Sequence, residues 1–446
     1  MGTIINALAR IYQTRLLNPV IVEFPDATTF SKKIQDLANL TDIGSLSLFG
    51  GPAGLREAAL PRDRFLARFQ NPLVTFKLLQ GLNMAALPLD RHSIDEVAQW
   101  TGTRIYPDRL QSILQFSVMP PEGIYQTKKG LNFTTTSWTK KMLGLDEANR
   151  IGWTGEGMVV TVPDTGGRNT HPQTRNMEYH STMKDKGQFI DKNGHGQWCC
   201  STIGGSKVVE PTYNVEMEGM APNCKLVGIK CLGFIMGIGF ESDIIQAIDM
   251  SINRQADIVS MSLGSEEIPD SPDDDAECVA IRKARNLGLI FCVAAGNSGP
   301  NDQTINTPGC SPDVLTVGAW DELAGNVAEF SSRGPVTWAD SSTLIKPDVI
   351  SPGVNIYSGC LGILDSVGDN MQNKYAILSG TSMATPHIAG LLACVKQYYK
   401  KSYGKALTLD LIKTICEAQG QLKDNYQGWG LATFQWFKDY ALANWA

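Results

Sequence analysis

Continuous apolar segments that alternate with runs of helical spacing constrain the fold of this chain more than any other feature. The apolar segments lie at residues 158–162, 226–230, 258–262 and 289–293, with helical runs between them at 241–253 and 276–286. Strands that are apolar on both faces are typical of a parallel sheet covered by helices on both sides. We therefore predict an α/β domain with a doubly wound, mostly parallel sheet over residues 141–446.

The first hundred residues predict a second, smaller domain. Strands are expected at 18–26 and 103–106, two short strands within 74–89, and helices at 29–40 and 93–101, the last with Ser93 as its N-cap. The order strand–helix–strand–strand–helix–strand predicts a ferredoxin-like α+β fold. We assign residues 18–109 to this domain, 1–17 to an N-terminal helix, 44–68 to an insertion or long loop, and the polar stretch 110–140 to an exposed linker.

Composition excludes several classes of protein. Apolar residues make up 43% and charged residues 19% of the 446 residues, which is typical of a globular protein. The net charge of −6 is mild and spread along the chain, which argues against a nucleic-acid partner. No stretch approaches the ~20 apolar residues of a membrane span, so we expect no membrane partner.

The cysteines indicate a reducing compartment. Ten are scattered along the chain, most of them inside apolar runs, which predicts buried free thiols. The first residues show no secretory signal, so we expect a cytoplasmic protein. Cys199 and Cys200 lie near His195, but two adjacent cysteines do not easily reach one ion, and we predict no metal site there.

Two polar residues follow apolar strands, Asp164 after the first and Asn297 after the fourth. Because ligands gather at the carboxyl ends of strands in open α/β sheets, we expect both residues at one rim. A buried carboxylate can orient an imidazole, and an amide can donate to a developing oxyanion. Each residue could equally serve only to close a turn.

Two further candidates lie at expected helix starts. His195 stands between two glycines, where its ring can face a cleft and act as a base, although a surface turn fits this motif as well. Ser382 precedes an apolar helix, where unpaired N–H groups favour negative charge. It could be a nucleophile or simply an N-cap.

Taken together, these four residues follow one another in the order Asp, His, Asn, Ser, and here the chain resembles the subtilisin-like serine proteases. The stretches that carry the resemblance are VPDTG at 162–166, NGHG at 193–196, GMAPN at 219–223, MSLG at 261–264, AAGNSG at 294–299, FSSRGP at 330–335, KPDVISPG at 346–353 and GTSMATPHIAG at 380–390. One such block could occur by chance, but eight in the family's order could not.

The resemblance implies a serine endopeptidase in which Asp164 orients His195, His195 acts as general base and then acid, Ser382 is the nucleophile and Asn297 stabilises the oxyanion. His171 and His387 match structural positions of the family. There are two departures, Pro163 at a usually aliphatic position and Gln197-Trp198 after the histidine motif. We expect Gln197-Trp198 to change the wall of the substrate cleft.

The resemblance also implies a role for residues 18–109, because family members often carry a ferredoxin-like propeptide that assists folding and caps the active site. We expect this domain to act as an intramolecular inhibitor of a zymogen. Self-cleavage is expected between Leu110 and Val118, with Phe116 as a candidate for the residue on the acyl side.

By the same resemblance, the substrate is a protein or peptide strand that lies between two edges of the chain. The residues expected to bind it are Gly237, Ile238, Gly239, Ser262, Leu263, Gly264 and, near the base of the primary pocket, Asn306. Apolar Ile238 and Phe240 predict a broad to medium preference for apolar or uncharged residues. No cofactor is required for the chemistry, and structural calcium is allowed without assigned ligands, loops at Asp185–Asp191 and Asp270–Asp275 being the candidates.

Two other functions were weighed. A catalytically silent binding scaffold, held shut by the N-terminal domain, would use the same fold, but the presence of all four candidate residues favours the enzyme. An α/β-hydrolase esterase would need a different chain order and a Gly-x-Ser-x-Gly turn at Ser382, which the sequence lacks.

Overall fold

The computed structural model describes residues 17–40, 77–114, 117–118, 133–183, 189–233, 237–265, 268–367 and 374–445. Its first part is a four-stranded antiparallel sheet with the order β2-β3-β1-β4, built from β1 (Leu17–Glu23), β2 (Lys77–Leu79), β3 (Met84–Asp90) and β4 (Arg104–Pro107). Helices α2 (Ala27–Leu40) and α4 (Arg91–Val97) cover one face of this sheet, packing Phe30, Ile34 and Val97 against Val20, Val22 and Leu87. The expected ferredoxin-like topology is therefore present.

Some expectations for this part need correction or lie outside the described residues. Helix α4 begins at Arg91, so Ser93 lies inside the helix and is not its N-cap. The helix expected before residue 17 and the insertion at 44–68 lie outside the described residues. The two short strands within 74–89 are joined by a short 3-10 turn, η1 (Gln80–Leu82), that ends with Asn83 in the left-handed region at φ 53°.

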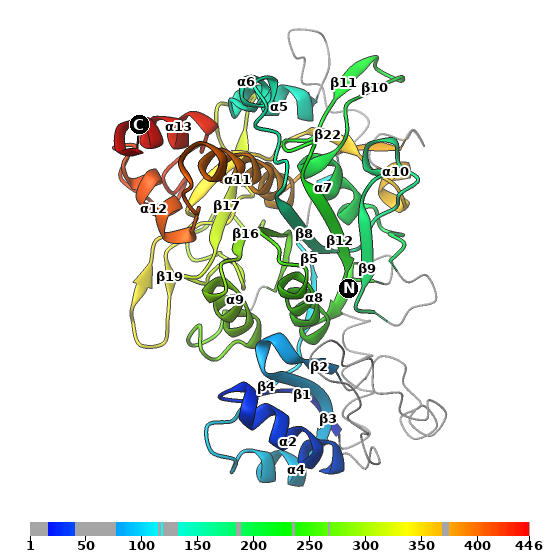
Figure 1. The fold of residues 1–446 in the computed structure, drawn as a ribbon, viewed down its shortest axis with the longest axis vertical. Helices are drawn as coiled ribbons and strands as arrows, with labels where there is room; N and C mark the ends of the chain where they lie inside the picture. Colours follow the sequence, from blue (N-terminus) through cyan, green and yellow to red (C-terminus); the bar gives the residue numbers. More distant parts are fainter. Residues whose placement is uncertain are drawn as a thin grey trace.

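The large part contains the predicted parallel sheet (Figure 1). Its order is β9-β12-β8-β14-β16-β17, with the parallel strand β21 and the antiparallel strand β18 both paired to β17. The bounds are β8 (Val159–Asp164), β9 (Glu178–Ser181), β12 (Lys225–Lys230), β14 (Ile258–Met261), β16 (Ile290–Ala294), β17 (Leu315–Asp321), β18 (Asn326–Val327) and β21 (Val349–Pro352). Strand β8 lies between β12 and β14, where the chain order reverses, and Asp164 ends it at this switch point.

Helices cover both faces of this sheet, as the apolar strands predict. Successive residues of β14 point to opposite faces: Ile258 belongs to the core with α7 (His195–Gly204) and α11 (Thr381–Tyr403), whereas Val259 belongs to the core with α8 (Glu241–Asn253) and α9 (Ala276–Asn286). Both faces of the central strand β14 therefore bury apolar surface, which stabilises the sheet by roughly 25 cal/mol per Å² removed from water.

The small domain packs on α8 and α9 through both apolar and charged contacts. Ile21, Leu79 and Tyr106 share the apolar core of the α8–α9 face. The buried Lys77 ammonium lies 2.8 Å from the Asp243 carboxylate. In addition, the Gly81 N–H donates to the Asp249 carboxylate at 2.7 Å. These contacts fix the small domain against the large one.

The described ends of the stretch 110–140 are not the exposed linker that its polarity predicts. Strand β5 (Leu110–Ile113) leaves the small domain and enters the large one (Figure 1). It lies there antiparallel between β13 (Ile238–Phe240) and β15 (Leu263–Gly264). At the other end, Lys140 in α5 (Thr136–Met142) is buried and pairs with Glu218 at 2.5 Å. The pairing of β5 and the burial of Lys140 both depend on partners that are distant in the sequence. The polarity of the stretch therefore does not predict them.

The remaining elements complete the large domain around the parallel sheet. A second four-stranded sheet has the order β6-β23-β22-β7. The bounds are β6 (Ser117–Val118), β7 (Thr134–Thr135), α6 (Leu145–Arg150), η2 (Pro172–Thr174), β10 (Val208–Glu210), β11 (Val215–Met217), β19 (Val336–Thr337), β20 (Thr343–Leu344), β22 (Ile356–Gly359), α10 (Ile363–Val367), β23 (Tyr375–Ser379), α12 (Leu409–Glu417) and α13 (Phe434–Trp445). Within the described ranges, no helix is both long and apolar enough to cross a bilayer.

Candidate active site

Asp164 and His195 form a buried pair at the carboxyl end of the sheet. Both side chains are fully buried, and Nδ1 of His195 lies 2.9 Å from Oδ1 and 3.0 Å from Oδ2 of Asp164. The Thr165 N–H also donates to Oδ1 at 2.6 Å, which holds the carboxylate in place. A carboxylate in this position keeps the proton of the neutral ring on Nδ1 and leaves Nε2 as the basic nitrogen.

The start of helix α7 explains why His195 occupies this position. Asp191 is buried and accepts three backbone N–H groups there, from Asn193 at 2.9 Å, Gly194 at 2.7 Å and Gln197 at 2.9 Å. Burial raises the pKa of Asp191, and the N–H donors act against that rise. The carboxylate satisfies N–H groups that the first turn of a helix leaves without partners. Asp191 therefore caps the start of α7, while Asp185, the other aspartate of the loop considered for calcium, lies outside the described residues.

The two glycines around His195 are needed for close approach. Gly194 has φ +109°, and a Cβ on it would lie 2.0 Å from the Leu361 carbonyl oxygen. A Cβ on Gly196 would lie 2.4 Å from the carbonyl oxygen of Gly166, next to the Asp164 strand. The motif NGHG therefore lets α7 begin directly against the end of β8.

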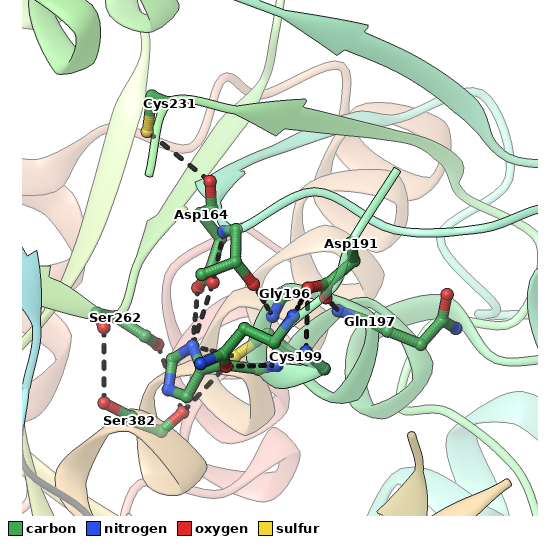
Figure 2. Close-up of polar contacts among 12 residues, drawn as sticks. Asp164, Asp191, Gly196, Gln197, Cys199, Cys231, Ser262 and Ser382 are labelled. Atoms are coloured by element: carbon green, nitrogen blue, oxygen red, sulfur yellow. Dashed lines mark hydrogen bonds and ion pairs between the residues drawn. The ribbon is translucent and has the colours of Figure 1, made fainter. Parts of the chain in front are cut away.

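Ser382 lies in the first turn of α11 and is fully buried. Its hydroxyl donates to the backbone carbonyl oxygen of Ser262 at 3.3 Å. Pro386, four residues further on, has no N–H to bond the carbonyl oxygen of Ser382, and that oxygen instead accepts from the Ser262 hydroxyl at 3.1 Å and the Cys199 thiol at 3.7 Å (Figure 2). Because of the proline, this carbonyl oxygen is free to join α11 to α7 and to Ser262, which lies between β14 and β15.

Cys199 lies between His195 and Ser382. Its Sγ lies 3.9 Å from Nδ1 of His195 as well as 3.7 Å from the Ser382 carbonyl oxygen. Because one small side chain contacts both residues, His195 and Ser382 are neighbours although they are 187 positions apart in the sequence. The sequence reasoning did not identify Cys199 in this role, although its spacing of four residues from His195 on a helix was a signal.

Cys199, Asp164 and His195 also form the one group with metal-ligand spacing that was found among the described residues, with ligand atoms within 4.8 Å of one another. The residues do not fit a metal well. The carboxylate is already bonded to the imidazole, and burial raises the pKa of the Cys199 thiol well above its usual value. A protonated thiol is a poor ligand.

Asn297 lies three residues past β16 and is half-buried. Its amide oxygen accepts the backbone N–H of Thr381 at 2.8 Å and the Thr381 hydroxyl at 2.9 Å. A side chain held by its oxygen directs its NH₂ group away from Thr381, the residue that begins α11. The structure therefore places Asn297 beside Thr381, the residue that precedes Ser382.

The expected substrate-binding residues line the place where β5 lies. Gly239 pairs with Gln111 and Ile238 with Ser112, while Gly264 pairs with Ser112 from the other side. The Ile113 N–H donates to the Gly237 carbonyl oxygen at 2.8 Å. A segment of the chain itself thus occupies the position expected for a substrate strand.

The remaining site predictions have different outcomes. Asn306 is buried, with its amide donating to the Ser265 carbonyl oxygen and its side chain packed against Gly296, beside Asn297. Phe116 lies outside the described residues. Gln197 and Trp198 do not form a wall of the cleft, because both are fully buried and bonded to interior groups such as Thr174 and the Ala376 carbonyl.

The other predicted histidines are structural. His387 bonds the Met383 carbonyl oxygen at 2.8 Å and the Thr139 hydroxyl at 2.7 Å, and His171 bonds the Lys374 carbonyl oxygen at 2.8 Å. Burial lowers the pKa of each to about 4, so both are neutral near pH 7. All ten cysteines are free thiols, as predicted.

The fold and the site together define a subtilisin-like arrangement, with an aspartate at the first central strand, a histidine and a serine at two helix starts, and an asparagine beside the serine. The chain belongs to the subtilase family (Peptidase S8), whose model matches residues 155–430.

Several proteases are similar to the chain. Serine protease AprX of Bacillus subtilis is 37% identical over 266 residues, which cover 55% of this chain and 58% of AprX. The thermostable alkaline protease of Halalkalibacterium halodurans is 33% identical over 265 residues, 59% of this chain and 64% of that protein. The major intracellular serine protease of Bacillus subtilis is 30% identical over 278 residues, 60% of this chain and 77% of that protein. The match thus covers less than two thirds of the first two relatives.

Proposed function

We propose that this protein is a serine endopeptidase that hydrolyses peptide bonds with Asp164, His195 and Ser382 as its triad. The observation that carries the proposal is the buried contact of both Asp164 oxygens with Nδ1 of His195, next to the helix that presents Ser382. Family membership and three relatives named as proteases support it.

In the proposed reaction, Ser382 turns its hydroxyl from the Ser262 carbonyl oxygen toward Nε2 of His195. His195 takes the proton while the serine oxygen attacks the substrate carbonyl carbon, and Asp164 stabilises the imidazolium that forms. His195 then returns the proton to the leaving amine, and water hydrolyses the acyl-enzyme by the reverse sequence.

The negative charge that forms on the substrate oxygen needs donors held in advance. The Asn297 amide and the N–H groups at the start of α11 are the groups placed for this, because α11 begins at Thr381, to which Asn297 is bonded. No metal or other cofactor takes part in this proposal. Asp275, in one of the loops considered for calcium, caps α9 by accepting the Cys278 N–H at 2.8 Å.

We further propose that the protein is made as a zymogen in which residues 18–109 inhibit the peptidase domain and are separated by self-cleavage between Leu110 and Val118. The position of β5 between β13 and β15 supports this, because a strand held there excludes a substrate strand. Two polar contacts hold the small domain in one position beside the cleft. Lys77 pairs with Asp243, and Asp108 accepts the Ser242 N–H.

We propose a preference for apolar or uncharged residues in the substrate. The strand that lies in the cleft is uncharged from Leu110 to Leu114, and Ile238 and Phe240 beside it are buried apolar residues. We also propose that the protein works inside the cell, as the ten free thiols and the name of the intracellular relative suggest.

Labelling with a serine-directed fluorophosphonate tests the activity. We expect one label per wild-type molecule, on Ser382, once the N-terminal domain has been separated, and none in Ser382→Ala. Labelling together with hydrolysis of an unstructured protein such as casein would support the peptidase. If wild type remains unlabelled under every processing condition, the binding scaffold is the better description.

A further inference from the structure

We infer that Leu114 is the residue whose carbonyl carbon Ser382 attacks during self-cleavage, and that the primary pocket of this peptidase therefore accepts leucine. The inference rests on the proposed function and assigns one bond within the window of residues 110–118. It replaces Phe116 as the residue on the acyl side.

The strand register leads from Leu114 to the nucleophile. Strand β5 runs antiparallel to β15 with Ser112 opposite Gly264 and Ile113 opposite Leu263. If this register is continued by one residue beyond the end of β5, Leu114 lies opposite Ser262, the residue before β15. Ser262 is bonded twice to Ser382, because its carbonyl oxygen accepts from the Ser382 hydroxyl and its own hydroxyl donates to the Ser382 carbonyl oxygen.

Burial along the strand gives an independent indication. Side chains of a strand point alternately to opposite faces, and β5 follows this rule with Gln111 buried, Ser112 half-buried and Ile113 buried. Leu114 should then share the more exposed face with Ser112, yet it is only 6% exposed. The break in alternation means that the Leu114 side chain enters a recess beyond the end of the strand.

Gly264 contributes to that recess. A Cβ on Gly264 would lie 3.4 Å from Cδ2 of Leu114 and 2.4 Å from the carbonyl oxygen of Thr307. The side chain of Leu114 therefore packs over Gly264, which lies beside the backbone of Thr307. Leucine fills the space that the missing side chain of glycine leaves open, so an apolar residue is selected at this position.

The other flank of the bond is also held. Ser117 and Val118 pair antiparallel with Ser379 and Leu378 of β23, which leads directly into α11 and Ser382. The described residues on both sides of this bond are therefore held by strand pairing, Ile113 by β15 and Ser117 by β23. Three peptide bonds connect Leu114 to Ser117. The register of β5 on β15 places the Leu114 carbonyl group at Ser262, and for this reason we assign the cut to the first of these bonds.

The step itself is an ordinary acyl transfer. The Ser382 oxygen forms a bond to the carbonyl carbon of Leu114, the bond from that carbon to the nitrogen of Gln115 breaks, and His195 moves the serine proton to the departing amine. Water then cleaves the ester, leaving Leu114 with a free carboxylate and restoring the serine hydroxyl. Atoms and charges balance without any further reactant.

Intact-mass measurement of the purified full chain and of Ser382→Ala tests the assignment. Wild type is expected to give two products, one ending at Leu114 and one beginning at Gln115, while Ser382→Ala stays whole. Products that divide after Gln115 or Phe116 would overturn the inference and leave the peptidase proposal standing. A chain that is neither cut nor labelled by fluorophosphonate would overturn the proposed function itself.

Matched substitutions test the pocket. Leu114→Asp should slow cleavage at this bond by at least about tenfold, because the pocket is apolar, whereas Leu114→Met should keep it close to wild type. The same change at the exposed Leu422, which lies outside β5, should alter the rate by no more than about threefold. Equal rates for Leu114→Asp and Leu422→Asp would contradict the inference.

A second measurement does not depend on the folding of variants. A synthetic peptide with the sequence of residues 109–118 is offered to processed wild-type protein, and the products are identified by mass. Hydrolysis after the leucine that corresponds to Leu114 is expected. Hydrolysis at any other bond as the main event would overturn the assignment.

Discussion

Two buried carboxylates hold His195, one through its ring and one through the backbone of its helix. Asp164 binds the imidazole, while Asp191 accepts N–H groups of Asn193, Gly194 and Gln197 without touching the ring. Asp191 is therefore a positioning residue. Hydrogen bonds to a buried charged group contribute about 1.5–3 kcal/mol each, so small changes at Asp191 have large consequences.

Asp191→Asn should destabilise the protein by about 2–3 kcal/mol, because the new NH₂ group faces the Gln197 N–H and one acceptor is lost. We expect a fall in kcat with little change in KM, since the substitution misplaces His195, the proposed base, and leaves the cleft unchanged. Denaturant unfolding in the Ser382→Ala background measures the first effect, and peptide hydrolysis by the processed protein the second. Asp340→Asn, which changes an exposed turn aspartate, is the matched control and should leave both unchanged.

At the scale of elements, β5 is a short strand whose place depends on neighbours on both sides. On the β13 side, the Ile113 N–H donates to the Gly237 carbonyl oxygen at 2.8 Å and the Arg109 carbonyl oxygen accepts the Glu241 N–H at 2.7 Å. On the other side, β5 pairs with β15. A strand in the middle of a sheet tolerates proline poorly, because proline has no N–H to donate.

Ile113→Pro should loosen the strand by removing its hydrogen bond to Gly237. One lost backbone bond of about 1 kcal/mol corresponds to about fivefold in an equilibrium constant. In the Ser382→Ala background, where the chain is expected to stay whole, a labelled substrate peptide should therefore bind at least about fivefold more tightly. Ser112→Ala, which keeps the backbone N–H, should not change this affinity, and equal peptide affinities for all three proteins would show that β5 does not limit access to the cleft.

At the scale of the whole molecule, the small domain is held by groups that can change charge. Asp249 accepts the Gly81 N–H across the interface, and burial raises its pKa from 3.8 to about 6. Burial also raises the pKa of Asp108, which accepts the Ser242 N–H at 2.9 Å. Both carboxyl groups bind protons more tightly in the associated form than in water.

Association of the two domains should therefore weaken as the pH rises. The contribution of Asp249 is fully present below about pH 3.8, where the separated domain is also protonated, and is lost as the pH passes through about 6. Because part of its burial persists in the separated large domain, we expect an effect on the order of tenfold in affinity. Size-exclusion chromatography of the cleaved protein between pH 4.5 and 7.5 measures it. Asp249→Asn should flatten this dependence, and an unchanged pH profile in that variant would contradict the assignment.

Much of the fold was predictable from sequence because its elements are marked locally. Helix α8 (Glu241–Asn253) and the strand that ends at Asp164 lie where periodicity placed them, since a strand buried on both faces leaves a continuous apolar run. The four candidate active-site residues were found because each stands at a strand end or helix start within a motif of small residues.

Tertiary structure alone decided what depends on contacts between distant segments. The burial of Lys140, the inward positions of Gln197 and Trp198, and the capping role of Asp191 all follow from partners that no local pattern names. The same is true of β5, because a polar segment becomes a central strand only where two edges with unpaired backbone groups are available. The sequence by itself determined which groups could do the chemistry, and the packing of the chain decided how they are held and which segment lies across them.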